Sequence, residues 1–431
     1  MEAWQSLVHV CRRWRSVAFG SPRRLNLRLL CKPGTRVRDK LAVWPPLLLV
    51  IWGSTCLTNP DGDGLTTLLE RRDRVCQINL CDAQLPLEKL IVAMQRPFPE
   101  LTDLVLSSFT TTETVLPDSF LGGSAPRLRE LQLFGIPFPG LPKLLLSAIH
   151  LVRIQLYDIT QSGYFSPEAL VTALSTLSSL KLLVLKFQFR SSSDLPSESR
   201  RPPTTRSLFP ALLTLSFDGF GGYLDDLVAR VDTPRLKNLE ITFFDQDELD
   251  VPQVTQFIRR TPMLEALEKA CVAFWFERAA VKLSLQTSGR GELEVKIMCR
   301  KLNRQVSTLK RLCTSYLPLS TSEDVYISGD IDPQADLEND VANILWLDLL
   351  HLITGVKNLY LSEEIVPLIW PALRGLVGGS TTEVLPIVQN IFLGEIQPRR
   401  PGLDGVEEFI AARRLSGRPI TVSTIPFGEE T

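Results

Sequence analysis

A six-residue apolar pattern recurs along this chain of 431 residues and constrains its fold more than any other feature. Six segments share the order apolar-x-x-apolar-x-apolar: LTDLVL (101–106), LRELQL (128–133), LVRIQL (151–156), LKLLVL (180–185), LLTLSF (212–217) and LKNLEI (236–241). VCQINL (75–80) fits the same pattern. The central apolar residues are Ile78, Leu104, Leu131, Ile154, Leu183, Leu215 and Leu239, separated by 26, 27, 23, 29, 32 and 24 residues. A recurrence of this length indicates one small supersecondary unit per period.

Each period predicts one strand followed by one helix. In the second half of the pattern, alternate side chains point to opposite faces, as in a half-buried strand. The stretches SPEALVTALSTLSSL (166–180) and GGYLDDLVARVDTPRL (221–236) instead carry apolar residues at helical spacing. One such unit cannot bury its apolar face alone, but stacked units can. We therefore expect an α/β fold, a leucine-rich-repeat-like solenoid with parallel strands on its concave face.

The solvent-facing strand positions predict a binding surface on the concave side, because they align in columns when the repeats are superimposed. As substrate-binding candidates we select Asp103, Glu130, Gln132, Phe134, Arg153, Gln155, Tyr157, Lys186, Asp218 and Glu240. Phe134 and Tyr157 fall on adjacent predicted strands, and aromatic residues are enriched at protein interfaces. Two interpretations stay open for this pair: it is exposed, or the neighbouring segment GIPFPG (135–140) covers it.

Beyond residue 245 the pattern weakens. VKNLYL (356–361) and VQNIFL (388–393) fit it, and SEDVYI (322–327) fits in part, whereas residues 251–318 indicate either irregular repeats or an insertion. We therefore expect four parts: residues 1–24, a helical module; 25–250, the solenoid; 251–318; and 319–431, with further leucine-rich-repeat-like units and a C-terminal cap.

The N-terminal segment WQSLVHVCRRWRSVAFGSPRRLNL (4–27) predicts an amphipathic helix. Its apolar residues recur at the spacing of one helix face, and they are Trp4, Leu7, Val8, Cys11 and Trp14. Gly20 and Pro22 end the helix near Phe19. A helix this short is marginal alone, so it must pack on the rest of the chain or on a partner.

The same segment resembles the second half of the F-box in fungal F-box proteins, where a Val-Cys-Arg-x-Trp-Arg helix precedes a Ser-Pro-Arg-Arg-Leu strand and a leucine-rich-repeat-like body. The likeness continues through TLLERRDRVCQINL (67–80), PFPELTDLVLSS (97–108), LPDSFLGGSAPRLREL (116–131), GLPKLLLSAIHLV (140–152) and VKNLYLSEE (356–364), and so spans most of the chain. The resemblance implies that residues 1–24 are the C-terminal part of an F-box, and that Trp4, Leu7, Val8, Cys11 and Trp14 contact a Skp-type adaptor. It also implies a non-catalytic recognition subunit of a Skp-cullin-F-box ubiquitin ligase, whose repeats bind a protein substrate.

The first half of the F-box, with its Leu-Pro-x-Glu-x-Leu motif, is missing from the sequence. We therefore expect a chain that begins within the module, from a truncated or misassigned gene or as a degenerate paralogue, with adaptor binding weakened or lost. The alternative function is a solenoid scaffold for protein-protein interaction that no longer binds an adaptor.

No pattern for catalysis, a metal or a cofactor emerges, so we expect a protein that is not an enzyme and binds no cofactor. His9, His150 and His351 belong to three different predicted elements. Cys76 and Cys81 lie five residues apart on one strand and so face opposite sides, which argues against a zinc pair. DGDG (61–64) lacks the closing glutamate of a calcium loop and indicates a plain turn.

Composition and cysteine usage predict a folded protein of a reducing compartment, the cytoplasm or the nucleus. Hydrophobic residues make up 44% and charged residues 22% of the chain, and eight cysteines are scattered among apolar neighbours. The longest apolar run, LAVWPPLLLVIWG (41–53), is too short to span a membrane and predicts a buried strand. Residues 1–40 carry ten Lys and Arg against two Asp and Glu, a net charge of +8 that raises nucleic acid as a partner. Trp14 belongs to the apolar stripe, so we favour packing over base stacking and expect no nucleic-acid ligand.

Overall fold

The structure is a computed structural model that describes residues 9–20, 27–32, 37–44, 46–53, 63–82, 87–108, 114–188, 205–244, 250–264, 269–275, 280–286, 291–299, 302–315, 319, 322–330, 339–375, 384–394, 406–415 and 417–424. The chain forms two compact units, Met1–Leu212 and Leu213–Thr431. Both are α/β and are built on mostly parallel strands.

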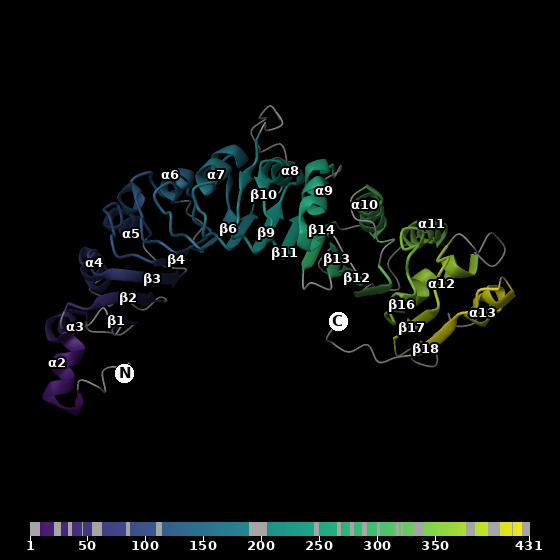
Figure 1. Cartoon of the computed structure of the whole chain (residues 1–431), viewed down its shortest axis with the longest axis horizontal. Helices are drawn as coiled ribbons and strands as arrows, with labels where there is room; N and C mark the ends of the chain where they lie inside the picture. The colour runs from purple at the N-terminus through teal and green to yellow at the C-terminus, as the bar shows by residue number, and fades with distance from the viewer. Residues whose placement is uncertain are drawn as a thin grey trace. The chain divides into compact units, whose positions relative to one another are not determined.

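The first unit is a parallel sheet with helices along one side. Its strands follow chain order across the sheet: β1 (Arg28–Cys31), β2 (Leu48–Gly53), β3 (Val75–Asp82), β4 (Asp103–Ser108), β5 (Glu130–Phe134), β6 (Arg153–Ile159) and β7 (Leu182–Phe187). The other elements are α2 (Arg12–Gly20), α3 (Val37–Val43), α4 (Asp63–Glu70), α5 (Leu87–Ala93), η1 (Phe120–Gly123), α6 (Leu141–Leu145), η2 (Gln161–Gly163), α7 (Pro167–Leu174) and β8 (Ser207–Leu208). Figure 1 shows α4, α5, α6 and α7 stacked along one side of these strands.

The apolar pattern sets the register of this sheet. The central apolar residues of five repeats are successive cross-strand partners: Ile78, Leu104, Leu131, Ile154 and Leu183. All five are buried, none more than 4% exposed. The prediction of one parallel strand per repeat, with its central leucine or isoleucine inside, is therefore confirmed for these repeats.

The helix between β6 and β7 lies within the stretch 166–180, where helical spacing predicted it, and it begins with a capped turn. Ser166 Oγ accepts a hydrogen bond from the backbone N–H of Ala169 at 3.2 Å, and Pro167 occupies the first helical turn. Both features favour a helix start, because the cap satisfies an otherwise unpaired N–H and proline has none to lose. The buried side of α7 includes Leu170, Val171 and Leu174.

The prediction of one buried strand over residues 41–53 is wrong in its first part. Residues 41–43 are the end of helix α3, and only β2 from Leu48 is strand. The reason lies in Pro45 and Pro46, which cannot continue a helix and push the preceding residue toward an extended conformation. Within β2 the burial alternates, so the strand has an open face rather than two buried ones.

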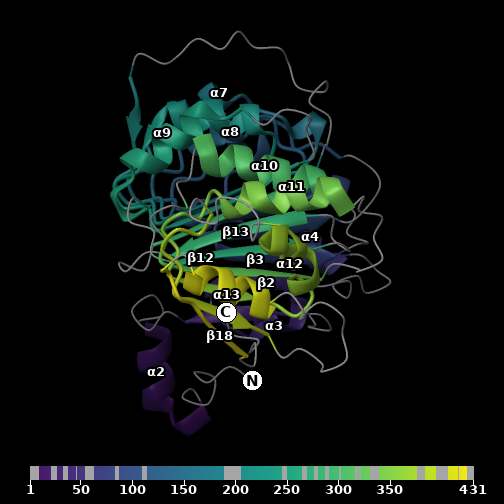
Figure 2. The same ribbon diagram turned by 90° about the vertical axis from the view of Figure 1, so that its right-hand side faces the viewer.

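The second unit contains the strand order β9 (Thr214–Gly219), β11 (Asn238–Phe243), β14 (Glu292–Met298), β13 (Ala280–Gln286), β12 (Lys269–Trp275), β15 (Asp324–Asp330), β16 (Asn358–Leu361), β17 (Asn390–Leu393) and β18 (Thr421–Thr424). Its other elements are α8 (Gly221–Ala229), β10 (Val231–Asp232), α9 (Pro252–Arg260), η4 (Pro262–Leu264), α10 (Leu302–Ser315), α11 (Asn339–Leu350), α12 (Val366–Gly375) and α13 (Val406–Leu415). Figure 2 shows α10 and α11 side by side on the same side of β12 and β13.

Residues 251–318, for which irregular repeats and an insertion were both open, contain a strand meander that departs from the repeat. β13 runs antiparallel to both β12 and β14. β14 then pairs in parallel with β11, and β12 pairs in parallel with β15. Only four residues of the sequence separate β12 from β13 and five separate β13 from β14, which suits antiparallel neighbours, because a parallel pair needs a crossover of a dozen or more residues. The chain here therefore replaces strand-helix units by hairpins.

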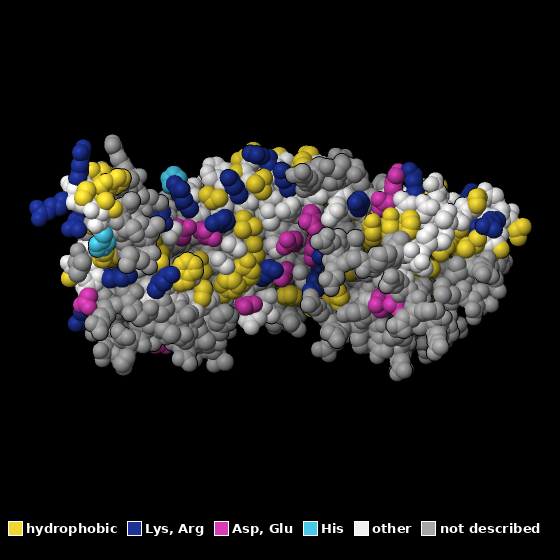
Figure 3. All heavy atoms as spheres, turned by 90° about the horizontal axis from the view of Figure 1, so that it is seen from below, with side chains coloured by type: hydrophobic (Ala, Val, Ile, Leu, Met, Phe, Trp, Pro, Cys, Tyr) yellow, Lys and Arg dark blue, Asp and Glu magenta, His cyan; other side chains and the backbone are white. Residues whose placement is uncertain are grey.

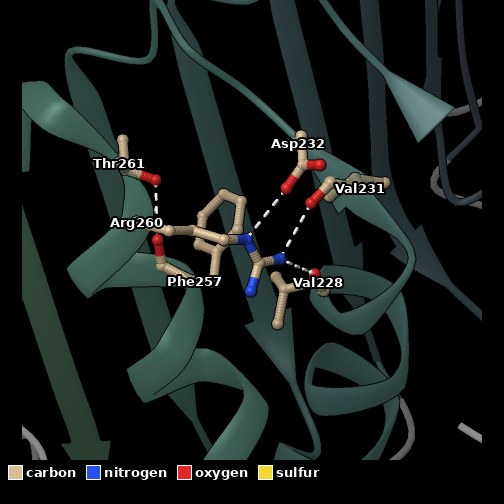
Figure 4. A network of polar contacts seen from close by, with 6 residues as sticks. All are labelled: Val228, Val231, Asp232, Phe257, Arg260 and Thr261. Carbon is tan, nitrogen blue, oxygen red and sulfur yellow. Dashed lines mark hydrogen bonds and ion pairs between the residues drawn. The ribbon is translucent and has the colours of Figure 1, made fainter. Parts of the chain in front are cut away.

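Arg260 ties α9 to the end of α8 in this second unit (Figure 4). Its Nε donates to Asp232 Oδ1 at 3.0 Å, and its Nη2 donates to the backbone carbonyls of Val228 and Val231. The guanidinium also lies over the Phe257 ring, 5.2 Å from the ring centroid. The side chain is only 21% exposed, so these contacts hold a charge that is largely withdrawn from water.

The seven described cysteines are thiols rather than disulfides, and their exposure differs sharply. Cys11 and Cys81 are exposed, whereas Cys31, Cys76, Cys299 and Cys313 are buried. The predicted opposite orientation of Cys76 and Cys81 on β3 is confirmed by this difference.

Alkylation is therefore expected to distinguish the exposed cysteines from the buried ones. Burial raises the pKa of Cys313 to about 12, so about one molecule in 10⁴ would carry a thiolate there at pH 8. Iodoacetamide in brief excess, followed by peptide mass spectrometry, should label Cys11 and Cys81 and leave Cys313 unmodified until urea is added. Equal labelling of Cys313 and Cys81 in the native protein would contradict this packing.

Among the helices in the described parts of the chain, none has both the length and the apolar character needed to cross a lipid bilayer.

Candidate binding surfaces

Helix α2 presents an apolar side that the described chain leaves uncovered. Trp14 is 52% exposed and Val17 58%, and Val10, in the helical turn before α2, is 66% exposed. Helical spacing places Trp14 and Val17 on one side of α2, whereas Val10 belongs to a separate helical turn, because Cys11 is not helical and the single predicted helix is interrupted there. Cys11 is also exposed, whereas Trp4, Leu7 and Val8 lie outside the described residues. The predicted helix end near Phe19 is confirmed, since α2 ends at Gly20.

The other end of α2 contacts the first unit through an aromatic pair. The rings of Phe19 and Trp44 meet edge to face with their centroids 6.1 Å apart. Such T-shaped pairs contribute about 0.5–1.5 kcal/mol beyond the area that they bury. Phe19 therefore packs on the segment after α3, while Trp14 and Val17 stay in solvent.

On the first unit, eight of the ten substrate-binding candidates lie on one open face of the sheet. Figure 3 looks onto the strand side, where hydrophobic, acidic and basic side chains are interspersed. The eight alternate along their strands with buried residues, and they are Asp103, Glu130, Gln132, Phe134, Arg153, Gln155, Tyr157 and Lys186. The structure thus brings together the residues that the repeat register aligned.

Phe134 and Tyr157 form the aromatic pair that their adjacent strands predict. Their rings stack with centroids 4.2 Å apart and planes 6° from parallel, and Lys186 Nζ lies 5.9 Å from the Tyr157 centroid. Both rings are half-buried. In the segment 135–140, Phe138 is buried and packs against Phe120 at 5.6 Å. The aromatic pair is therefore partly exposed: its rings are neither fully exposed nor fully covered, so neither interpretation holds completely.

Polar contacts between strands fix the charged candidates of this face. Arg153 Nη2 donates to Glu130 Oε2 at 2.5 Å, and this hydrogen bond raises the pKa of Arg153. Gln77 Nε2 donates to Asp103 Oδ2 at 2.7 Å. Glu130 is therefore charge-paired with Arg153, whereas Asp103 is hydrogen-bonded to a neutral amide and keeps its negative charge, and amides and aromatic rings fill much of the rest of the face.

Trp52 is a further residue of this face, one that the repeat pattern does not predict. It lies on β2, is 56% exposed and has Asn79 of β3 as its cross-strand neighbour. The apolar run around it, LLLVIWG (47–53), favours a wholly buried strand and so conceals it. Strand alternation alone could not have found it, because every neighbouring residue is apolar and the sequence does not say which side of β2 is open.

The remaining two candidates, Asp218 and Glu240, belong to the second unit. They lie on the adjacent strands β9 and β11 and on the same face, since Asp218 pairs with Thr242 and Glu240 with Ser216. Glu240 is exposed and Asp218 half-buried.

The same face of the second unit carries an aromatic ladder outside the candidate set. Tyr326, Tyr360 and Phe392 are successive cross-strand partners on β15, β16 and β17. Tyr326 and Tyr360 stack at 4.1 Å and 8°, and Tyr360 and Phe392 at 4.6 Å and 14°. All three are half-buried and alternate with buried leucines, isoleucines and a valine.

A row of amides runs beside this aromatic ladder. Asn390 Nδ2 donates to Asn358 Oδ1 at 2.8 Å, and Asn358 Nδ2 donates to Asp324 Oδ1 at 2.7 Å. The row therefore ends on a carboxylate. The signal was present in SEDVYI, VKNLYL and VQNIFL, which place Asp or Asn and then Tyr or Phe at the two solvent-facing positions of the pattern.

Burial, followed by the hydrogen bond with Tyr360, raises the pKa of Tyr326 to about 12. Near neutral pH this phenol therefore keeps its proton and can act as a hydrogen-bond donor. The ladder as a whole offers ring edges, phenolic hydroxyls and amides, which are the groups of a binding surface rather than of a nucleophile-base pair.

Within the described ranges, no group of three or more His, Cys, Asp and Glu side chains is placed to hold a metal ion. His9, His150 and His351 are each exposed.

Comparison with known proteins adds no assignment. No protein-family model matches the chain, and none of the curated proteins matches it significantly.

Proposed function

We propose that this chain is a non-catalytic substrate-recognition subunit of a Skp-cullin-F-box type ubiquitin ligase. In this proposal the α2 helix binds a Skp-type adaptor, and the open strand faces of a leucine-rich-repeat-like solenoid bind a protein substrate. The observation that carries it is the uncovered apolar side of α2, in the segment that resembles an F-box helix.

The exposure of α2 supports the adaptor half of the proposal. Trp14 and Val17 are each more than half exposed on a helix of nine residues that would be marginal without a tertiary partner, and Val10, in the helical turn before α2, is more than half exposed as well. Tryptophan is among the residues that most often dominate binding energy at interfaces. A partner that covers this side would remove a large apolar area from water.

The strand faces support the substrate half. Parallel strands in register, one per period of the sequence pattern, are what stacked repeat units would produce. Aromatic rings, amides and charges alternate on the open faces, and this composition suits protein ligands. We assign the protein to the cytoplasm or nucleus, a location with which its free cysteine thiols are compatible.

Capture of a purified fungal Skp-type adaptor by the full chain tests the proposal. We expect binding, and we expect the Trp14→Ala change to weaken it at least tenfold, because truncation of a central interface tryptophan costs about 2 kcal/mol or more. Isothermal titration calorimetry with the two purified proteins measures the change.

Leu146→Ala is the matched control, because Leu146 is a similarly exposed apolar residue (53%) of the first unit. Its adaptor affinity should stay within twofold of the unchanged chain. The adaptor role would be refuted if no binding were detected at an adaptor concentration 100-fold above the one at which F-box proteins and their adaptors usually associate. Equal adaptor affinity of Trp14→Ala and Leu146→Ala would refute it as well.

The second candidate function is a protein-interaction scaffold that has lost adaptor binding. The observation that favours it is that both stacked aromatic clusters, Phe134 with Tyr157 and Tyr326 with Tyr360 and Phe392, lie on the strand faces and need no adaptor. Failure of adaptor capture together with retained ligand binding on those faces would select this function.

A further inference from the structure

The open face of the second unit carries two acidic residues in one cross-strand row, and the neighbouring row contains a shelf of two small side chains, Cys271 and Ser284. Asp324 on β15 and Glu292 on β14 lie in one cross-strand row, with Lys269 of β12 and Gln286 of β13 between them. In the next row, Cys271 and Ser284 lie between Tyr326 and Glu294.

Because the shelf residues are small, no ring on the neighbouring strand β12 stacks on the second face of Tyr326. One side of this ring stacks on Tyr360, and the strand on its other side presents the small side chain of Cys271. Cys271 and Ser284 are both half-buried, so the surface reaches solvent there. An aromatic face of this kind attracts a cation, and a guanidinium can also stack on it as a plane.

Charge at the two ends of the shelf favours a basic ligand. Asp324 Oδ1 accepts from Asn358, so Oδ2 is left to receive a second donor. At the other end, Glu294 Oε2 forms an ion pair with Lys282 Nζ at 2.5 Å. Glu292 and its diagonal cross-strand neighbour Glu240 are exposed and have no ion pair within the described chain. Three lysines of the same face oppose this charge: Lys269 lies between Asp324 and Glu292, Lys282 pairs with Glu294, and the Lys296 Nζ lies 5.6 Å from the centroid of the Trp275 ring.

The spacing of the two ends sets the spacing of the ligand. From β15 to β14 there are three strand intervals of about 4.8 Å each, or about 14 Å. An extended peptide rises about 3.4 Å per residue, so four residues cover the same distance. Residues four apart in an extended peptide also point to the same side.

We infer that this face binds an extended polypeptide segment with two basic residues four positions apart, one arginine on Tyr326 and Asp324 and the second basic residue on Glu292 and Glu240. The segment crosses β12 and β13 over Cys271 and Ser284. This assignment rests on the proposed function for its biological meaning, since the segment would belong to the recognised substrate, but the binding itself needs no adaptor.

Fluorescence anisotropy with the full chain and two labelled peptides of equal composition tests the inference. GGRSGSRGG has arginines four apart, and GGRSRSGGG has them two apart. We expect the first to bind at least about fivefold more tightly, because only it reaches both acidic ends. Tyr326→Leu, Asp324→Asn and Glu292→Gln should each weaken it by about threefold to tenfold.

Two further variants make the outcome specific. Glu364→Gln removes the same charge from an exposed position before α12 and should leave affinity within twofold. Lys269→Ala removes the competing cation on the path and should tighten binding by about twofold to threefold. Circular dichroism of each variant confirms that the fold is retained.

Equal affinity for the two peptides, unchanged binding by Tyr326→Leu, or no binding of either peptide at 1 mM overturns the inference. These results are independent of the adaptor experiment, because Trp14→Ala should not change peptide affinity and Asp324→Asn should not change adaptor capture. Loss of adaptor binding alone would therefore refute the ligase role and leave the peptide site standing.

Discussion

Replacement of Arg260 by alanine is expected to lower the free energy of unfolding of the second unit by about 2–3 kcal/mol. The change removes hydrogen bonds to Asp232 and to the carbonyls of Val228 and Val231, as well as the contact with the Phe257 ring. Two carbonyls at the end of α8 and one carboxylate then lose their charged donor. Because the Arg260 side chain is 21% exposed and Asp232 42%, water offsets some of this loss, and the value stays below that of a fully buried pair.

Urea unfolding followed by circular dichroism measures this effect, and the chain provides a matched control at the next position. Arg259 is exposed on the same last turn of α9, and Arg259→Ala should change the free energy of unfolding by about 0.5 kcal/mol or less. Arg260→Lys should fall between the two, since lysine keeps the charge but cannot donate from a planar fork. Equal stability of Arg259→Ala and Arg260→Ala would show that the network contributes nothing.

Replacement of Gly135 by alanine is expected to cost about 3 kcal/mol in the first unit. Gly135 follows β5 directly and has a φ of +59°, a conformation that costs other residues about 1 kcal/mol or more. A Cβ there would also lie 2.6 Å from the carbonyl oxygen of Ser108, which is backbone and cannot rotate away. The turn after Phe134 would have to shift, and with it the hydrogen bond from Gly135 N–H to the Tyr157 carbonyl at 3.0 Å.

Two other glycines separate the strain of the backbone from the steric contact. Gly417 has a φ of +73° but open space where the methyl group of an alanine would lie, so Gly417→Ala should cost only about 1 kcal/mol. Gly20 has open space and no positive φ, and Gly20→Ala should be neutral within about 0.5 kcal/mol. If Gly135→Ala is no more destabilising than Gly417→Ala in urea unfolding, the close approach to Ser108 has no energetic consequence.

Much of the candidate surface follows from local periodicity. The alternation within LRELQL and LVRIQL is enough to place Glu130, Gln132 and Gln155 on the open side, because side chains of a strand alternate and the leucines must face the helices. The same rule puts Tyr360 and Phe392 in the open column, because VKNLYL and VQNIFL fit the pattern although their repeats lie 32 residues apart. Trp52 shows the limit of the rule, since every residue around it is apolar and hydrophobicity does not say which side is open.

The amino-acid sequence was enough to predict the strand-helix period, the register of the central apolar residues from Ile78 to Leu183, the helix within 166–180 and the end of α2. These features depend on residues close together in the chain, whose conformational preferences act locally. The three-dimensional fold was needed to show that β13 runs antiparallel between β12 and β14, and that Tyr326 therefore faces a shelf that ends at Glu292 and Glu294. Strand pairing between distant segments depends on which apolar faces can be buried together, and that choice is made by the whole unit rather than by any one segment.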